Sequence, residues 1–389
     1  MEAYIIAANR TAIAKAKKGG FKNYRSDDLA VDVIKAMMAQ FPQIENKMVD
    51  DVIVGCANPE GEQGLQMGRQ ISLRALGETA PGFIINRYCA SGLESIALAV
   101  AKIKAGMGHI IFAGGTESMT AIPMTGYKLA PNYGVAATTP DYVVSMGITA
   151  EAVAQKYEVT REQADEFAYN SHVKAAAAID AGKFDDQIIP ITVPDVNVIN
   201  NKKVVSEHVV KMDEGVRRST TVEALSKLRP VFQKGGVVTA GNSSQTSDGA
   251  SFVIVVSEEM VKQLNLQPIA RLVTYAVGGV DPLYMGIGPT VAIPKALKQA
   301  GMTLNQIDQI ELNEAFATQS LAVIKDAGLN PDIVNVNGGA IALGHPLACT
   351  GAKLSTQLFS EMRLRKQKYG MVTACVGGGQ GMAGIWELL

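Results

Sequence analysis

A chain of 389 residues is too long for one ordinary hydrophobic core, so two or three structural units are expected. Its 36 Lys and Arg residues nearly balance its 37 Asp and Glu residues, and the net charge of −1 gives no reason to expect a nucleic-acid or anionic membrane surface. The four cysteines, at positions 56, 89, 349 and 375, have neither metal-ligand nor redox spacing, which favours a reducing compartment over a disulfide scaffold.

The first residues, Met1-Glu-Ala-Tyr-Ile-Ile-Ala-Ala, begin with an acid and a strand-like run, unlike a secretory signal. No apolar run approaches the roughly 18 to 20 residues that a membrane span requires. We therefore expect a soluble, cytoplasmic protein with no membrane span and no nucleic-acid partner.

Strand-like and helix-like segments alternate from residue 1 to about 118, which is typical of a doubly wound α/β layer. The sequence predicts strands at 4–7, 52–54 and 110–113, a helix capped by Ser26 and another helix at 65–76. Gly114-Gly115 is expected to end the third of these strands.

Residues 119 to 247 break this alternation and are predicted to form an inserted subdomain that begins with a proline-rich loop. Within it, Thr160-Arg-Glu-Gln is a capping box that predicts a long helix ending at about Ala181. The segment also concentrates positive charge, at Lys202, Lys203, Lys211, Arg217, Arg218, Lys227 and Arg229. Such a charge run is most often a solvated face, although it would also suit an anionic ligand.

Alternation resumes at the strand 251–256, and the second half of the chain then resembles the first. Asp51 and Asp308 open similar strands, and about 38 residues after each comes a glycine-rich turn, which holds Cys89 in one copy and His345 in the other. Two similar layers packed against each other would place these turns at the same end of the molecule.

Cys89 is expected where a short buried strand, 83–85, gives way to a helix that begins near Leu93. The free N–H groups of the first helical turn would face the sulfur and lower its pKa from about 8.5. The alternative is a buried apolar thiol, which is the commoner role of a lone cysteine.

The C-terminal half supplies partners for such a thiol. His345 lies in a turn so rich in glycine that a purely structural role is hard to justify, and Cys375 precedes the glycines 377–379 at the end of a strand. Asn313 follows the strand 310–312 and would present a side-chain amide. The other histidines, at 109, 172 and 208, are interpreted as structural, as are Cys56 and Cys349.

Five ordered motifs then resemble the thiolase family over the whole chain. They are Asn86-Arg-Tyr-Cys-Ala-Ser-Gly-Leu, Gly241-Asn-Ser-Ser-Gln-Thr-Ser-Asp-Gly-Ala, Asn313-Glu-Ala-Phe, Gly338-Gly-Ala-Ile-Ala-Leu-Gly-His-Pro and Cys375-Val-Gly-Gly-Gly-Gln-Gly. The resemblance implies an α/β thiolase-like fold of two repeated βαβαβαββ layers with an inserted loop domain. We assign 1–118, completed by about 248–268, to the N-terminal half, 119–247 to the loop domain and 269–389 to the C-terminal half.

The resemblance also implies the chemistry, with coenzyme A as co-substrate, no covalently bound cofactor and no metal. Cys89 would attack a 3-oxoacyl-CoA while His345 takes its proton, and Cys375 would protonate the acetyl-CoA enolate and then activate CoA. The N–H groups of Cys89 and Gly377 would form one oxyanion site, and His345 with a water held by Asn313 would form the other. CoA would bind along Arg217, Ala240, Ser244, Ala315 and Phe316.

Several readings of the residues remain open. A decarboxylative ketoacyl synthase needs no second thiol base, so Cys375 argues against it. A non-catalytic CoA- or lipid-binding protein would not need all of these groups. Within the family, Arg87 and Ser145 favour a degradative 3-ketoacyl-CoA thiolase of fatty acid β-oxidation over a short-chain acetyl-CoA C-acetyltransferase. Acyl chain length, dimer or tetramer, and a complex with a hydratase and dehydrogenase are left undetermined.

Overall fold

The computed structural model describes residues 1–389 except the side chain of Ile199. Eleven strands join in one mixed sheet, with the order β11-β12-β13-β10-β1-β9-β5-β3-β4 and with β2 and β6 attached to β9 and β1. The two halves of the chain form the two halves of this sheet, and they meet at the pair Ile5 and Ala270 of β1 and β10.

The N-terminal half has the predicted βαβαβαββ order. Its elements are β1 (Ala3–Thr11), β2 (Ala14–Lys15), α1 (Ser26–Gln40), β3 (Asp51–Gly55), α2 (Met67–Leu76), β4 (Phe83–Ile85), α3 (Ser91–Lys104), β5 (Ile110–Ser118) and β9 (Ser247–Ser257). Apart from the two-residue β2, these elements contain one copy of the βαβαβαββ order, and its last strand, β9, comes after the insertion in the chain. A single polypeptide repeat therefore accounts for this half of the sheet.

The C-terminal half repeats the pattern with one strand reduced. Its elements are β10 (Ala270–Gly279), α9 (Pro289–Ala300), β11 (Gln309–Leu312), α10 (Ala317–Asp326), α11 (Ala340–Leu343), α12 (Thr350–Arg365), β12 (Tyr369–Val376) and β13 (Gln380–Leu388). The C-terminal half has no full strand that corresponds to β4; at that place there is only an isolated bridge between Ile310 and Val334. The sheet orders β1-β9-β5-β3 and β10-β13-β12-β11 otherwise correspond strand for strand.

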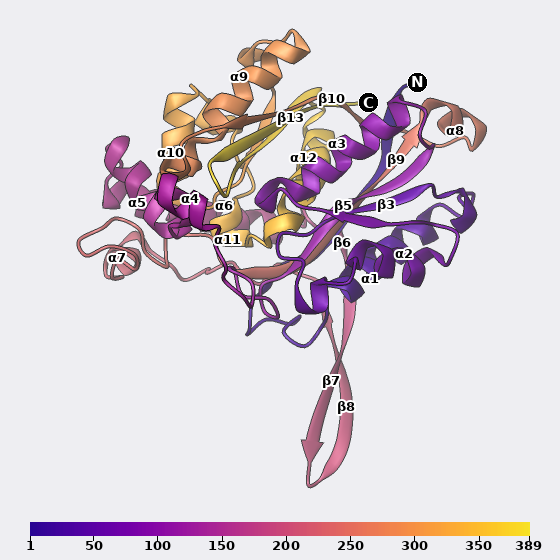
Figure 1. Cartoon of the computed structure of the whole chain (residues 1–389), viewed down its shortest axis with the longest axis horizontal. Helices are drawn as coiled ribbons and strands as arrows, with labels where there is room; N and C mark the ends of the chain where they lie inside the picture. The colour runs from indigo at the N-terminus through magenta and orange to yellow at the C-terminus, as the bar shows by residue number, and fades with distance from the viewer.

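Helices α3 and α12 pack against each other between the two half-sheets and share one apolar core with both (Figure 1). Alternate residues of the central strands face two different cores, as the period of a β-strand requires: Phe252 and Ile254 pack toward α1, whereas Val253 and Val255 pack toward α3. Helix α9 covers the outer face of the C-terminal half. The resulting layers hold the N-terminal ends of α3 and α12 close together.

Three local predictions were wrong. Strand β5 continues through Gly114 and Gly115, and both glycines are needed for close packing: a Cβ on Gly114 would overlap the Ser251 carbonyl oxygen of β9, and a Cβ on Gly115 would overlap the Ala348 carbonyl oxygen of the turn Leu347–Cys349 (η8). Strand β4 is half-buried, since it forms the edge of the sheet. Ser26 is the first residue of α1, and Arg25 occupies the N-cap position.

The segment between β5 and β9 contains most of the irregular structure. Its elements are α4 (Tyr133–Thr138), η4 (Pro140–Val143), α5 (Met146–Lys156), α6 (Arg161–Asp180), β6 (Ile188–Ile189), β7 (Ile191–Ile199), β8 (Lys202–Val210) and α7 (Val222–Ser226). The predicted capping box is confirmed, because the Thr160 hydroxyl accepts from Gln163 N and the Gln163 side chain accepts from Thr160 N. The boundaries of the insertion at 119 and 247 remain a prediction.

Strands β7 and β8 form a two-stranded hairpin that projects from the body of the molecule (Figure 1). Lys202 and Lys203 open β8 at the outer end of this hairpin, whereas the Arg217 N–H donates to His172 of α6 in the body of the molecule. Arg218 is paired with Asp180. The basic residues of the insertion therefore do not form one cluster.

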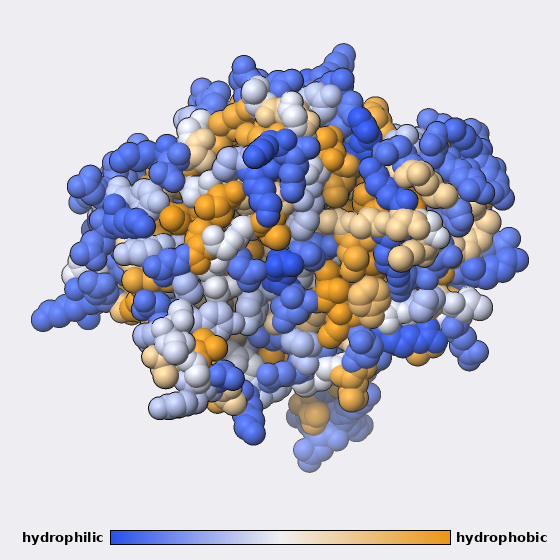
Figure 2. All heavy atoms as spheres, turned by 45° about the horizontal axis from the view of Figure 1, so that its top comes forward, coloured by the Kyte–Doolittle hydropathy of each residue, from blue (hydrophilic) through white to orange (hydrophobic). Residues whose placement is uncertain are grey.

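Hydrophilic side chains cover the two flanks of the face in Figure 2, and apolar side chains reach the surface between them. None of the helices in the described part of the chain combines the length and the apolar character needed to cross a lipid bilayer.

Candidate active site

Cys89 lies in a short 3-10 turn, Tyr88–Ala90 (η3), between β4 and α3. Tyr88 has a φ of 44°, a left-handed conformation that costs about 1–3 kcal/mol in a bulky residue and persists where neighbouring groups enforce it. Tyr88 N donates to Asn86 Oδ1 at 2.8 Å, and the Ser91 hydroxyl donates to Tyr88 O at 2.7 Å. These bonds hold the turn so that Cys89 packs against Leu347 of η8.

The expectation of a lowered pKa for Cys89 was wrong. Burial raises the pKa of this thiol to about 12, and the N–H groups of Gly377 and of Cys89 itself only partly oppose that rise. The helical turn thus directs its own amide at the sulfur, but the loss of water around the thiolate has the larger effect. In the resting protein Cys89 is a neutral thiol at pH 7.

His345 follows α11 and is only 5% exposed. Its Nδ1 lies 2.6 Å from the Thr350 hydroxyl, which itself donates to Pro346 O at 3.3 Å. Since the hydroxyl proton is used by that carbonyl, Nδ1 carries the ring proton and Nε2 keeps its lone pair. Burial, and then the charge of Lys353, lower the pKa of His345 to about 3, so the ring is a neutral base.

Asn313 stands beside this base. Its Nδ2 lies 3.4 Å from His345 Nε2, and its backbone N–H donates to Thr373 O at 2.9 Å, which fixes the loop to the end of β12. Asn313 Oδ1 is buried and has no hydrogen-bond partner among the described atoms. A free buried acceptor next to the imidazole would suit a water or a substrate group.

Cys375 is 1% exposed, near the end of β12. Burial raises its pKa, and the nearby Cys89 sulfur raises it further. After it the chain turns through Gly378 and Gly379, whose φ angles of 80° and 84° favour glycine. This turn aims the Gly377 N–H at Cys89.

The turn η3 packs against both η8, directly after His345, and β12, which carries Cys375. The structure therefore brings the five predicted catalytic and oxyanion residues to one place: Cys89, His345, Cys375, Asn313 and Gly377. Four of the five come from turns or strand ends of the C-terminal half, and only Cys89 comes from the N-terminal half. Within the described chain, no three His, Cys, Asp or Glu residues are grouped so as to hold a metal ion.

Comparison with known proteins agrees with this arrangement. Residues 3–259 match the model of the thiolase N-terminal domain, and residues 266–388 match that of the thiolase C-terminal domain. The chain belongs to the thiolase family.

Among its relatives, a 3-ketoacyl-CoA thiolase of Bacillus subtilis is 49% identical over 389 residues, which is 100% of this chain and 99% of the relative. An acetyl-CoA acetyltransferase of Escherichia coli is 43% identical and covers 99% of this chain and 98% of its own. The solved structure of human mitochondrial 3-ketoacyl-CoA thiolase has a TM-score of 0.89 and 38% identity, covering 100% of this chain and 99% of that one.

Three of the five residues predicted to bind CoA lie together in this thiolase. Ser244 N donates to Ala315 O at 2.9 Å, while Ala315 and Phe316 belong to the same apolar cluster as Cys375. Arg217 and Ala240 are exposed, and no described hydrogen bond links them to the other three. These two remain predictions for the outer part of a CoA path.

Sequence reasoning missed residues that surround the site. The Tyr142 ring lies over the glycine turn, because a Cβ on Gly378 would be 2.8 Å from it, and Tyr88 lies over Gly377. Thr350, which orients His345, could have been suspected from its place one turn beyond the histidine at the start of a helix. Tyr142 carried no such signal, since it is distant in sequence from every motif.

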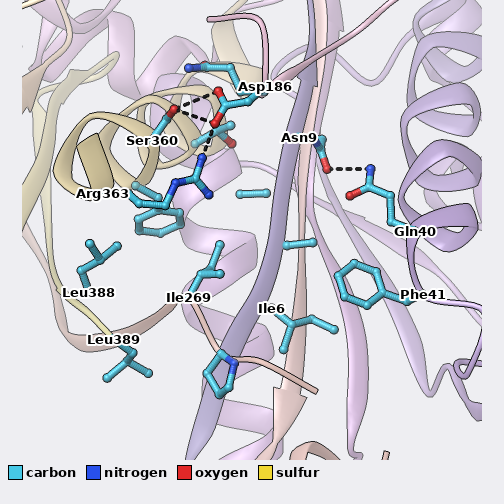
Figure 3. A pocket seen from close by; sticks show the side chains of 16 residues that line it. Ile6, Asn9, Gln40, Phe41, Asp186, Ile269, Ser360, Arg363, Leu388 and Leu389 are labelled. Carbon is cyan, nitrogen blue, oxygen red and sulfur yellow. Dashed lines mark hydrogen bonds and ion pairs between the residues drawn. The ribbon is translucent and has the colours of Figure 1, made fainter. Parts of the chain in front are cut away.

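Two hollows were not predictable from the sequence. One, of about 580 Å³, is lined by Tyr142, Val143, Val135 and neighbouring residues of the insertion, and the Tyr142 ring also lies against Gly378. The other, of about 210 Å³, lies where β1 and β10 meet, between Ile6 and Leu389, and is bordered by the bonds that Asp186 accepts from Ser360 and Arg363 (Figure 3). None of the predicted site residues lines either hollow.

Proposed function

We propose that this thiolase cleaves 3-oxoacyl-CoA with coenzyme A, giving acetyl-CoA and an acyl-CoA shortened by two carbons, and that it also catalyses the reverse Claisen condensation. The observation that carries the proposal is the meeting of two thiols, Cys89 and Cys375, with a neutral His345 and two N–H groups directed at Cys89. Carbon–carbon cleavage beside a thioester needs these groups: a nucleophile, a base, an acid and oxyanion donors.

In the first half-reaction, the Cys89 sulfur bonds to the 3-keto carbon as its proton passes to His345 Nε2. The tetrahedral alkoxide then collapses, the bond between carbons 2 and 3 breaks, and the acyl group stays on Cys89. The leaving enolate of acetyl-CoA takes a proton from Cys375, which becomes a thiolate.

In the second half-reaction, the Cys375 thiolate takes the proton of the incoming CoA thiol. The CoA sulfur then attacks the acyl thioester, and the oxyanion that forms accepts from the N–H groups of Cys89 and Gly377. Cys89 leaves with the proton held by His345, so all three groups return to their starting states. Because acetyl-CoA departs before CoA attacks, ping-pong kinetics are expected.

A neutral resting pair suits this cycle. With a thiol pKa of about 12 and an imidazole pKa of about 3, Cys89 and His345 do not exchange a proton until a substrate arrives. The electrophile therefore drives the transfer, since the developing alkoxide, rather than a free thiolate, receives the negative charge. Each oxyanion donor would contribute about 3 to 4 kcal/mol to the barrier lowering.

The hollow beside Tyr142 supports a substrate with an acyl chain longer than four carbons. Its lining is largely apolar, and Tyr142 connects it to the glycine turn at Cys89. The second candidate is a short-chain acetyl-CoA C-acetyltransferase that makes acetoacetyl-CoA, because the Escherichia coli relative and a solved Bacillus anthracis structure with a TM-score of 0.90 carry the name acetyl-CoA acetyltransferase.

Self-association is part of the proposal. Strand β4 ends the sheet with Phe83, Ile84 and Ile85 only half-buried, and an apolar edge strand of this kind is suited to contact with another chain. We propose a homodimer or homotetramer that works in the cytoplasm on acyl-CoA substrates, with or without a hydratase and dehydrogenase of β-oxidation.

The test is thiolysis of 3-oxoacyl-CoA esters of four to sixteen carbons, followed as loss of the 3-oxoacyl-CoA absorbance. We expect kcat/KM to be higher for the medium and long esters than for the four-carbon ester. Substitution Val143→Trp, which would fill the hollow, should lower only the values for the longer esters. Activity confined to the four-carbon ester would favour the acetyltransferase, and no cleavage of any ester would reject both candidates.

A further inference from the structure

One buried carboxylate behind the site has no part in the chemistry described above. Glu117, at the end of β5, is 1% exposed and accepts four hydrogen bonds. Its Oε2 accepts from Ala57 N at 2.8 Å and Ala348 N at 3.2 Å, and its Oε1 accepts from Gln63 Nε2 at 2.7 Å and Asn58 N at 3.4 Å. All four partners are N–H donors, so they favour the ionised form and oppose the burial that raises the pKa of Glu117.

Two of these bonds lead to the catalytic groups. Ala57 O accepts from Asn86 Nδ2 at 2.9 Å, and Asn86 Oδ1 accepts the Tyr88 N–H that fixes the strained turn before Cys89. In the other direction, Ala348 lies three residues after His345, in the turn η8 that packs against Cys89.

We propose that Glu117 is a positioning residue whose carboxylate ties the turn that carries Cys89 to the turn that carries His345. It is the one side chain with described hydrogen bonds to both the loop behind Cys89 and η8. The two turns belong to different halves of the chain, and their alignment decides whether the Cys89 proton can reach the imidazole. Misplacement by about 1 Å costs up to about a hundredfold in rate.

The charge of Glu117 has a second, separable consequence. A negative charge near Cys89 opposes formation of a thiolate, and it contributes to the raised pKa of that thiol. Removing the negative charge of Glu117 should therefore ease deprotonation of Cys89. Shortening the side chain while keeping its charge should not.

The inference rests on the proposed roles of Cys89 and His345, and two variants separate its parts. Glu117→Asp keeps the charge but is one methylene shorter, so it cannot reach both Ala57 and Ala348. Glu117→Gln keeps the length, but its amide NH₂ group must face an N–H donor. Glu151→Gln is the control, because Glu151 is a buried carboxylate that also accepts two backbone N–H bonds, from Val237 and Val238, and contacts neither catalytic turn.

The readouts are kcat per folded molecule in thiolysis and the rate of Cys89 alkylation by iodoacetamide at pH 8, quantified on the Cys89 peptide by mass spectrometry. We expect both Glu117 variants to lose about tenfold to a hundredfold in kcat. Because alkylation follows the thiolate fraction, its rate should be higher than the wild-type rate in Glu117→Gln and should match it in Glu117→Asp and Glu151→Gln.

Wild-type kcat in the Glu117→Asp protein, or an unchanged alkylation rate in a folded Glu117→Gln protein, would overturn the inference. If Glu117→Gln does not fold, the kcat of Glu117→Asp decides alone. Failure of the proposed function would give another result. The wild-type protein itself would then cleave no 3-oxoacyl-CoA, while the rate of Cys89 alkylation could still be measured.

Discussion

The two halves of the sheet share a topology, yet they contribute unlike groups to the site. The N-terminal half supplies one nucleophilic sulfur from the turn before α3, and the C-terminal half supplies His345 from the corresponding turn before α12. The C-terminal half also lacks a full strand where the N-terminal half has β4. A repeated fold thus fixes where the loops meet, whereas the residues on those loops decide the chemistry.

The two sulfurs, one from each half of the chain, also differ in their surroundings. Cys89 is half-buried and has two N–H groups directed at it, while Cys375 is buried and has only its own N–H. The difference suits Cys89 to hold an acyl group, whose carbonyl oxygen needs donors. It suits Cys375 to exchange protons, a task that needs no oxyanion site. The predictions below test this division of labour.

The largest expected effect comes from Cys89→Ser. A hydroxyl is a far weaker nucleophile at neutral pH, so turnover should fall by at least about a thousandfold. Intact-mass measurement after mixing with an acyl-CoA should find no acyl adduct on this variant. An adduct of unchanged yield would remove Cys89 from its assigned role.

Cys375→Ser should separate the two halves of the cycle. The variant should still be acylated at Cys89 by an acyl-CoA, but carbon–carbon cleavage should fall by about a hundredfold to a thousandfold because proton transfer to the enolate is lost. The same mass measurement and a thiolysis assay check this. Normal thiolysis in the variant would contradict the division between the two sulfurs.

Asn313→Ala should have a smaller effect. The change removes the amide beside His345 Nε2, and the loss of one oxyanion-stabilising group should lower kcat by about a hundredfold. KM for CoA should change little, because Asn313 lies at the reacting end of the site. Steady-state kinetics with varied CoA give both values, and a rise in KM alone would assign Asn313 to binding.

Gly92→Ala tests the contact between the halves. A Cβ at Gly92 would lie 2.6 Å from Ala348 O and 2.8 Å from Ala352 N, so α3 and α12 must move apart, at a cost of about 1–3 kcal/mol in unfolding free energy. Gly301→Ala is the control: it has a φ of 63° and open space, and should lose about 1 kcal/mol with kcat unchanged. Equal kcat in the two variants would mean that the spacing of α3 and α12 does not govern the site.

The last prediction concerns stability in mild acid, and it has the smallest effect on turnover at neutral pH. Burial lowers the pKa of His345 to about 3 and that of His172 to about 4, below the value of about 6.5 in an unfolded chain. As pH falls below about 6.5, the unfolded chain binds protons that the folded chain does not, so the unfolding free energy should fall by up to about 1.4 kcal/mol per pH unit for each histidine. Urea unfolding at pH 7.5, 5.5 and 4.5 measures this slope, and His172→Gln should reduce it. A slope unaffected by that change would contradict the buried, neutral state of His172.

Much of the site could be predicted from local sequence because its residues lie in turns that are marked by glycines and by the ends of periodic apolar segments. Cys89, His345 and Cys375 each stand beside glycines at the end of a periodic segment, and the repeat in the chain predicted that their turns would meet. The capping box at Thr160 predicted the start of α6, since capping depends on neighbours within one turn.

Only the tertiary structure decided the properties that depend on distant atoms. The pKa of Cys89 rises because the packed halves exclude water, an effect that outweighs the local N–H groups. Gly115 lies within β5 because η8, more than 200 residues away in the chain, packs directly on it. By itself, then, the sequence determined which residues stand at the turns. The packing of one half on the other determined their charge states and the link through Glu117, since electrostatics and close contact depend on distance in space.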